Sequence, residues 1–238
     1  MQKLIGVLVF AALVVSGCGG GGDGGSGGNT GPVVSRQSFN IKTAIASYTS
    51  TPHSYTFTGS GTLNGAPITV TGTGDLSVLT AGTFEGQTAL QQTQTTNLTI
   101  TENGNPTPLS SVVTLFYLPA DYSPLGSTSP DDYEVIDPGT TYPTTAKVGD
   151  SGMVGTAKRY SDSTKSTLIR SATGSYRVEA DTASSAIVNL VTVTTFIQPT
   201  LSPQTETIRY RLDSVGTFTL LSESLVSAAG NLTIVPVN

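Results

Sequence analysis

The alternation of apolar and polar positions predicts antiparallel strands along much of the chain. In residues 55–63, aromatic, glycine or leucine positions alternate with Thr and Ser, and Asn64-Gly65 follows. This dipeptide is typical of a two-residue hairpin turn. The alternation resumes over residues 66–71, and a second alternating stretch at 97–101 leads to Asn103-Gly104. Both dipeptides therefore predict hairpins.

One segment near the N-terminus has helical rather than strand periodicity. Apolar side chains recur in residues 38–48 at the spacing of one helix face, and Ser38 stands where a helix N-cap is expected. The residues of this face are Ile41, Ala44, Ile45 and Tyr48.

The C-terminal part has the pattern of a β-meander. Strands are expected at residues 154–161, 168–180, 186–197, 205–212, 218–226 and 232–237, with turns at 162–165 and around Gly216 and Gly230. Residues 112–118 are apolar on both faces, which indicates a buried strand. The predicted fold class is mainly β: an antiparallel meander forming a barrel, a half-barrel or a sandwich, with one N-terminal helix.

Residues 119–147 break this periodicity. They are rich in Pro, Asp, Ser, Gly and Tyr, and we expect a long central loop that is functional, flexible or both. Tyrosines cluster around this loop, where they either pin it to the core or form a recognition surface. They are Tyr117, Tyr122, Tyr133 and Tyr142.

The first eighteen residues follow the order of an export signal. Lys3 precedes an uncharged apolar run at 4–15 that is too short to span a bilayer as a helix. The run ends in Val15-Ser16-Gly17-Cys18, which resembles the lipobox of bacterial lipoproteins. The resemblance implies cleavage before Cys18, lipidation of its sulfur, and attachment of the mature chain to a membrane.

The same resemblance guides the expected location. Gly19, rather than aspartate, follows the cysteine, which in enteric-type sorting favours the outer membrane. We expect residues 1–17 to be a signal peptide and 18–32 a lipidated Gly-rich tether with a reach of about 20 Å. Residues 33–238 are expected to form a single β-rich domain.

Composition narrows the classes of function. The chain is 37% hydrophobic and 11% charged, with a net charge of -5, which excludes the basic surface that nucleic-acid binding requires. No Lys or Arg occurs between Lys42 and Lys147, although eight acidic residues lie there. This asymmetry indicates either two differently solvated surfaces or an acidic face that collects cations.

The most suggestive catalytic motif is Gly149-Asp150-Ser151-Gly152. It resembles the nucleophile region of chymotrypsin-like proteases, and His53 lies upstream of it as that family requires. Met153 follows in place of the family's Gly-Pro, and Thr51-Pro52 precede the histidine in place of the family context. The alternative is a β-turn that leads into a strand, because Gly and Asp favour such conformations.

Metal and cofactor chemistry finds little support. His53 and Cys18 are the only residues of their kinds, which excludes sites that need two imidazoles or a free thiolate pair. Close-spaced carboxylates can bind calcium, although the spacing here matches no calcium-loop signature. They are Asp131, Asp132, Glu134 and Asp137. We expect neither a cofactor nor a resident metal.

These patterns favour a non-enzymatic lipoprotein that is anchored in the cell envelope by lipid. It would either bind a partner protein, a polymer or an apolar ligand, or have a structural role. One version is a curved sheet whose concave side is covered by the 38–48 helix, similar in architecture to half-barrel carriers of lipid and lipoprotein. The alternatives are a hydrolase that uses Ser151 and His53, and a calcium-binding surface domain.

Overall fold

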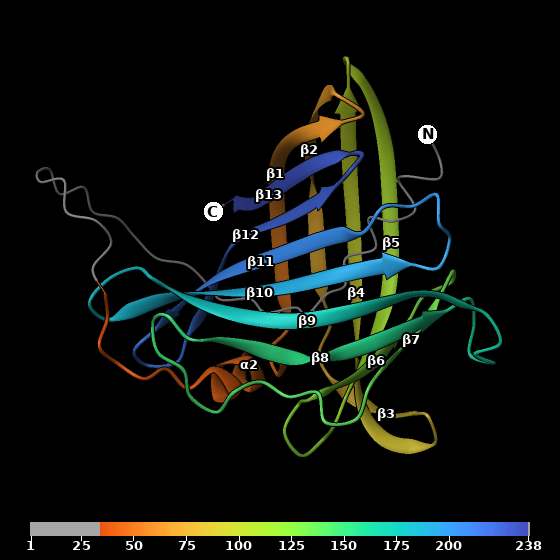
Figure 1. The fold of residues 1–238 in the computed structure, drawn as a ribbon. Helices are drawn as coiled ribbons and strands as arrows, with labels where there is room; N and C mark the ends of the chain where they lie inside the picture. Colours follow the sequence, from red (N-terminus) through yellow and green to blue (C-terminus); the bar gives the residue numbers. More distant parts are fainter. Residues whose placement is uncertain (1–33, 238) are drawn as a thin grey trace, which may run out of the picture.

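The computed structural model describes residues 34–237, and thirteen strands form one continuous antiparallel sheet (Figure 1). The expected mainly β meander is therefore confirmed. The strands are β1 (His53–Leu63), β2 (Ala66–Leu76), β3 (Thr80–Phe84), β4 (Gln87–Glu102), β5 (Asn105–Tyr117), β6 (Pro124–Thr128), β7 (Tyr133–Ile136), β8 (Ser151–Tyr160), β9 (Leu168–Ala180), β10 (Ser185–Phe196), β11 (Gln204–Asp213), β12 (Phe218–Ser227) and β13 (Gly230–Val237).

The sheet closes on itself as a twelve-stranded barrel. Strand β1 pairs with both β2 and β13, and β2 pairs with β4 over the register Ile68↔Glu102 to Leu76↔Gln94. The extra strand β3 pairs only with the beginning of β4. Of the three architectures that the sequence left open, the closed barrel is therefore the one adopted, and the half-barrel version was wrong. Closure leaves no unpaired edge in the ring.

Residues 119–147 contain two strands, so the expectation of one long loop was wrong. Strands β6 and β7 pair with β5 and β8, respectively, and with each other. They complete the wall that joins the two long-stranded parts of the barrel. With five and four residues, they are too short to establish a periodic pattern among the Pro, Gly and Asp residues that surround them.

The turn predictions are confirmed. Asn64 and Gly65 have φ angles of 50° and 82°, and Asn103 and Gly104 have 50° and 78°, as a two-residue hairpin turn requires. Glu85-Gly86 makes a third such turn between β3 and β4, with φ angles of 51° and 77°. Sequence inspection missed it because a glutamate seldom occupies a left-handed conformation.

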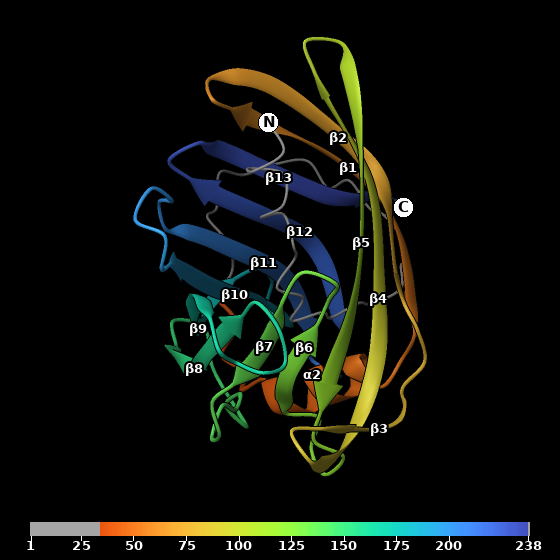
Figure 2. The ribbon, with the colours of Figure 1, turned by 90° about the vertical axis from the view of Figure 1, so that its right-hand side faces the viewer.

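Helix α2 (Ile41–Thr49) lies across one end of the barrel, opposite the β1–β2 and β4–β5 turns (Figures 1 and 2). The predicted apolar face is confirmed, but the helix begins later than expected. Asn40, not Ser38, is the N-cap, and its Oδ1 accepts from the Thr43 amide at 3.1 Å. At the other end of the helix, the buried Gln92 side chain donates to the Thr49 carbonyl at 3.5 Å.

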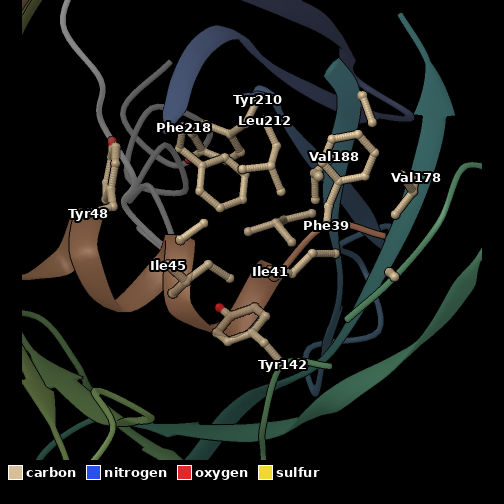
Figure 3. Close-up of a cluster of buried hydrophobic side chains, with 14 of the residues drawn as sticks. Phe39, Ile41, Ile45, Tyr48, Tyr142, Val178, Val188, Tyr210, Leu212 and Phe218 are labelled. Atoms are coloured by element: carbon tan, nitrogen blue, oxygen red, sulfur yellow. The ribbon is translucent and has the colours of Figure 1, made fainter. Parts of the chain in front are cut away.

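The apolar face of α2 packs into a core inside the barrel (Figure 3). Ile41 and Ile45 contact inward-facing side chains of β9 to β12, among them Val188 and Tyr210. A second apolar cluster lies between β13, β1, β2 and β4, and includes Val70. These two clusters fill the helix end and one side of the interior.

Candidate functional site

Polar chemistry inside the barrel concentrates on the side opposite the second apolar cluster. Cross-strand register places Glu134, Arg159 and Arg170 side by side on β7, β8 and β9. Glu206 shares the inward face of β11 with Ile208, and Glu223 lies opposite Ile208 on β12. Asp132 lies just before β7. We define the charged cluster as the following six residues: Asp132, Glu134, Arg159, Arg170, Glu206 and Glu223. Consecutive strands therefore bring together groups that are far apart in the sequence.

The two arginines hold two of the acids in ion pairs. The Arg159 guanidinium donates to Glu134 through Nε at 2.8 Å, and a second nitrogen also bonds this carboxylate. Asp132 Oδ2 accepts from Arg159 at 3.3 Å and from Arg170 at 2.7 Å. Arg159 and Arg170 are only 5% and 8% exposed. Charges removed from water in this way depend on their partners for stability.

Glu206 and Glu223 form a hydrogen-bonded carboxyl pair. Burial raises the pKa of Glu206 to about 7, although the bond with Glu223 and the nearby Arg159 and Arg170 guanidinium groups act in the opposite direction. Burial and the neighbouring Glu206 raise the pKa of Glu223 well above its usual value. A hydrogen bond between two carboxyl groups needs a proton, so the pair holds at least one near neutral pH.

One donor in the cluster has no partner among the described residues. Arg170 Nε is buried and makes no hydrogen bond, although another nitrogen of the same guanidinium bonds Asp132. The guanidinium carbon lies 6.0 Å from the centre of the Phe196 ring. A buried N–H without an acceptor is costly, which makes Arg170 Nε a place where a ligand or a water molecule gains a bond.

Adjoining cavities run through the interior past this cluster. The cavity beside Arg159, Arg170 and Glu206 has a volume of about 30 Å³. It shares Glu134, Ala157 and Ala172 with a more apolar cavity of about 70 Å³. On its other side, Gln204 and Leu225 also line a cavity of about 50 Å³ near the Ser227–Gly230 turn. One water molecule needs about 10–15 Å³ of such a cavity, so each cavity has room for a few waters.

The barrel does not bring Ser151 and His53 together. Their strands, β8 and β1, lie six steps apart in either direction around the ring. Helix α2, about 13 Å long, separates them: Tyr48 stacks on His53 with a centroid distance of 4.6 Å, whereas Phe39, before the helix, pairs with Ala146. The protease-like arrangement is therefore not formed.

Each of the two candidate catalytic residues has a structural setting instead. His53 Nε2 lies 3.1 Å from the Tyr48 carbonyl, and burial lowers the pKa of the imidazole. Gly149 has a φ of 98°, and Asp150 Oδ2 accepts from the Lys147 amide at 2.8 Å. The Gly-Asp-Ser-Gly segment is thus the turn that leads into β8.

The four acids considered for calcium face different partners. Asp132 and Glu134 pair with arginines, as described above. Asp137 accepts a hydrogen bond from the Thr156 hydroxyl, and Asp131 is exposed. Among residues 34–237, no group of three or more His, Cys, Asp or Glu side chains is placed to hold a metal ion.

Cross-strand pairing also explains the uneven charge distribution. Asp121 lies 2.6 Å from Lys42, and Glu85 forms an ion pair with Lys165. Together with the Asp132 and Glu134 pairs, these contacts match acids of the stretch without basic residues to bases outside it. The charge asymmetry along the sequence thus becomes local neutrality in the fold at these four acids.

The tyrosines near the central segment mostly serve packing. Tyr117 and Tyr142 are buried, which raises the pKa of both phenols. The Tyr133 ring lies 5.3 Å from Phe84 of β3, and its hydroxyl donates to Glu85 at 2.6 Å. Of the two interpretations, pinning describes these three, whereas Tyr122 lies in a turn with a φ of 58°.

Sequence analysis missed the charged cluster, although a signal for part of it was present. Glu206 has the same parity as Ile208 and Tyr210 on β11, and Arg170 has that of Val178 on β9. Charged residues in phase with apolar ones indicate inward-facing charge. Their mutual proximity depends on barrel closure and could not be derived from spacing.

The predicted signal peptide, the Cys18 lipidation site and the tether lie outside the described residues. No helix in the part of the chain that the structure describes is long and apolar enough to span a bilayer.

No model of a known protein family matches the chain, and no curated protein or solved structure is similar to it at a significant level.

Proposed function

We propose that this chain is a lipid-anchored lipoprotein of the cell envelope, in the outer membrane, with a non-enzymatic binding role. Lipid on Cys18 holds it at the membrane, and the barrel presents its far rim to a partner protein or polymer. The proposal joins the lipobox-like Val15-Ser16-Gly17-Cys18 to one structural observation: the described chain begins at the end of the barrel that α2 closes.

This observation supports an average orientation, since the Gly-rich tether itself is flexible. Phe39 pairs with Ala146 beside α2, so residues 34–39 approach the barrel at its closed end. A tether that ends there places α2 nearest the membrane. The hairpin turns at Asn64-Gly65, Asn103-Gly104 and Ser227–Gly230 then lie farthest from it (Figures 1 and 2). A partner that approaches from solution meets these turns first.

The outer wall supports a role in water rather than as a carrier of long acyl chains. On β1 and β2 the outward positions carry Thr56, Thr58, Thr69, Thr71 and Thr73, all exposed. The interior holds apolar side chains, the charged cluster and cavities the size of a few waters. A closed, largely filled barrel favours recognition by its rim and loops over transport of an extended lipid.

The anchor is tested by expressing the full chain in a bacterial host and measuring the mass of the N-terminal peptide. The expected product begins at an acylated Cys18 and fractionates with the outer membrane. Cys18→Ser should release the protein from the membrane while the barrel keeps its circular dichroism spectrum. An unacylated thiol in the wild-type protein, or a retained leader, would refute the proposal.

The orientation and rim are tested by site-specific cross-linking on intact cells. A photoreactive residue at Asn103 is expected to capture a specific partner, whereas one at Lys147, near the closed end, is the matched control. Equal capture at both positions, or none at either, contradicts display of the far rim.

A further inference from the structure

We propose that the cavity beside Arg159, Arg170 and Glu206 is a binding site for a small amino alcohol, a primary ammonium ion whose oxygen acceptor is separated from the nitrogen by two carbon atoms. The ammonium group is held by Glu206, which has Glu223 beside it, and the oxygen accepts from Arg170 Nε. This proposal does not depend on the lipid anchor.

The unpaired donor identifies the first ligand group. Arg170 is 92% buried, lines the cavity, and its Nε lacks an acceptor. Another nitrogen of the same guanidinium bonds Asp132, so the guanidinium cannot turn away without breaking this ion pair. A neutral oxygen suits Nε better than a second anion, because Asp132 already balances the charge of Arg170.

The acid pair identifies the second ligand group. The charged groups that line this cavity are Glu134 from β7, Arg159 from β8, Arg170 from β9 and Glu206 from β11. Behind them, Asp132 pairs with both arginines and Glu223 of β12 lies next to Glu206. Two arginines balance two acids and leave Glu206 and Glu223 over. Glu223, whose pKa is raised well above its usual value, keeps one proton, and the second proton, which Glu206 binds with a pKa of about 7, brings this remainder close to neutral.

A small ammonium ion can replace that proton without changing the charge of the cluster. Its N–H groups donate to the carboxylates, and Thr194 and Gln204 line the same space. An anionic ligand would add negative charge to a site that already takes up a proton. A zwitterion would leave one negative charge unbalanced. A monocation with one oxygen acceptor therefore fits the charge and the donor together.

Size and access agree with this class of ligand. Gln204 and Leu225 line both this cavity and the 50 Å³ cavity near the Ser227–Gly230 turn, so the site lies close to the far rim. A ligand of four heavy atoms is comparable with the few waters that these spaces hold. Larger amines exceed the described space.

The experiment is calorimetric titration of the purified full-length protein with ethanolamine at pH 7 and pH 5.5. Binding should weaken roughly tenfold at pH 5.5, because the ligand must then displace a full proton rather than about half of one. Titrations in buffers of different ionisation enthalpy should show release of about half a proton at pH 7. Propylamine, which lacks the oxygen, should bind several-fold more weakly, and sodium acetate should not bind.

The matched variants are Glu206→Gln and Glu179→Gln. The first keeps the shape and removes the inward charge, and should lower ethanolamine affinity at least tenfold. The second removes a charge on the outer face of β9 and should leave affinity unchanged. If Glu206→Gln does not fold, the pH dependence and proton release of the wild-type protein decide the matter.

Three results would overturn the proposal: no heat of binding at millimolar ethanolamine, equal affinity at both pH values, or binding of acetate in place of the amine. The first would mean that water alone satisfies Arg170 Nε.

Discussion

The two sides of the barrel bury different kinds of side chain. The side built from β1, β2, β4 and β13 fills its inner face with apolar side chains and glycines, and the outer faces of β1 and β2 carry mainly hydroxyl groups. The side built from β7 to β12 packs apolar side chains against α2, but nearer the far rim it buries arginines and acids that pair with one another. The first side depends on close packing and the second on charge balance, so each should fail under a different perturbation.

The largest effect is expected from unbalancing the charged side. Arg159→Met should lower the free energy of unfolding by about 3–5 kcal/mol, because Glu134 loses its partner and Asp132 loses one of two. Urea denaturation measures the loss. The double variant Arg159→Met/Glu134→Gln should recover part of it, and failure to recover any would show that packing rather than charge dominates here.

The next effect depends on how close a neighbouring strand lies to a glycine. A Cβ on Gly61 of β1 would lie 2.0 Å from the Asn231 carbonyl oxygen, so the backbone must shift. Gly61→Ala should cost about 1–3 kcal/mol.

The matched control is Gly174→Ala on β9, where the nearest atom to the new Cβ is 3.7 Å away. This variant should leave stability unchanged or raise it by up to about 1 kcal/mol. Equal losses in thermal melts of the two variants would contradict the difference in local packing between these two positions.

The charged side should also make stability depend on pH. The pKa of Glu206 is raised to about 7 in the fold, so the folded state binds more protons than the unfolded state between about pH 4.5 and pH 7. Stability should therefore fall as pH rises through this window, by roughly 1 kcal/mol per pH unit.

The control for this trend is Glu206→Gln, which should remove the part of the slope that comes from Glu206, whereas Glu223, whose pKa is also raised, keeps the rest. His53 acts in the opposite direction below about pH 6.5, because burial lowers its pKa, but it contributes equally in both proteins. Denaturation curves at several pH values that are parallel for the two proteins would contradict the role of Glu206.

The smallest effect is expected on the outer wall of the apolar side. Thr71 is exposed on β2, with Thr58 and Thr99 beside it on the neighbouring strands. Thr71→Lys should change stability by less than about 0.5 kcal/mol, as measured by thermal melting. A larger loss would mean that this wall is covered in the native protein.

Turns, strands and the helix face were predictable because short stretches of sequence determine them. The Asn-Gly turns, the alternating strands and the apolar face of α2 were all correctly identified, because hairpin turns and side-chain periodicity depend on neighbouring residues. The helix start was misplaced because Ser38 was expected to cap the helix, whereas Asn40 caps it. Strand β6 was missed because five residues make too short a pattern.

The sequence by itself determined a mainly β chain with one short helix, since alternation and turn chemistry are local properties. Only the tertiary structure decided that the sheet closes through β2 and β4, that Ser151 and His53 lie on opposite sides, and that Arg159, Arg170 and Glu206 meet inside. These outcomes depend on strand order and register, which set distances between residues far apart in the chain. No pattern within a single strand contains that information.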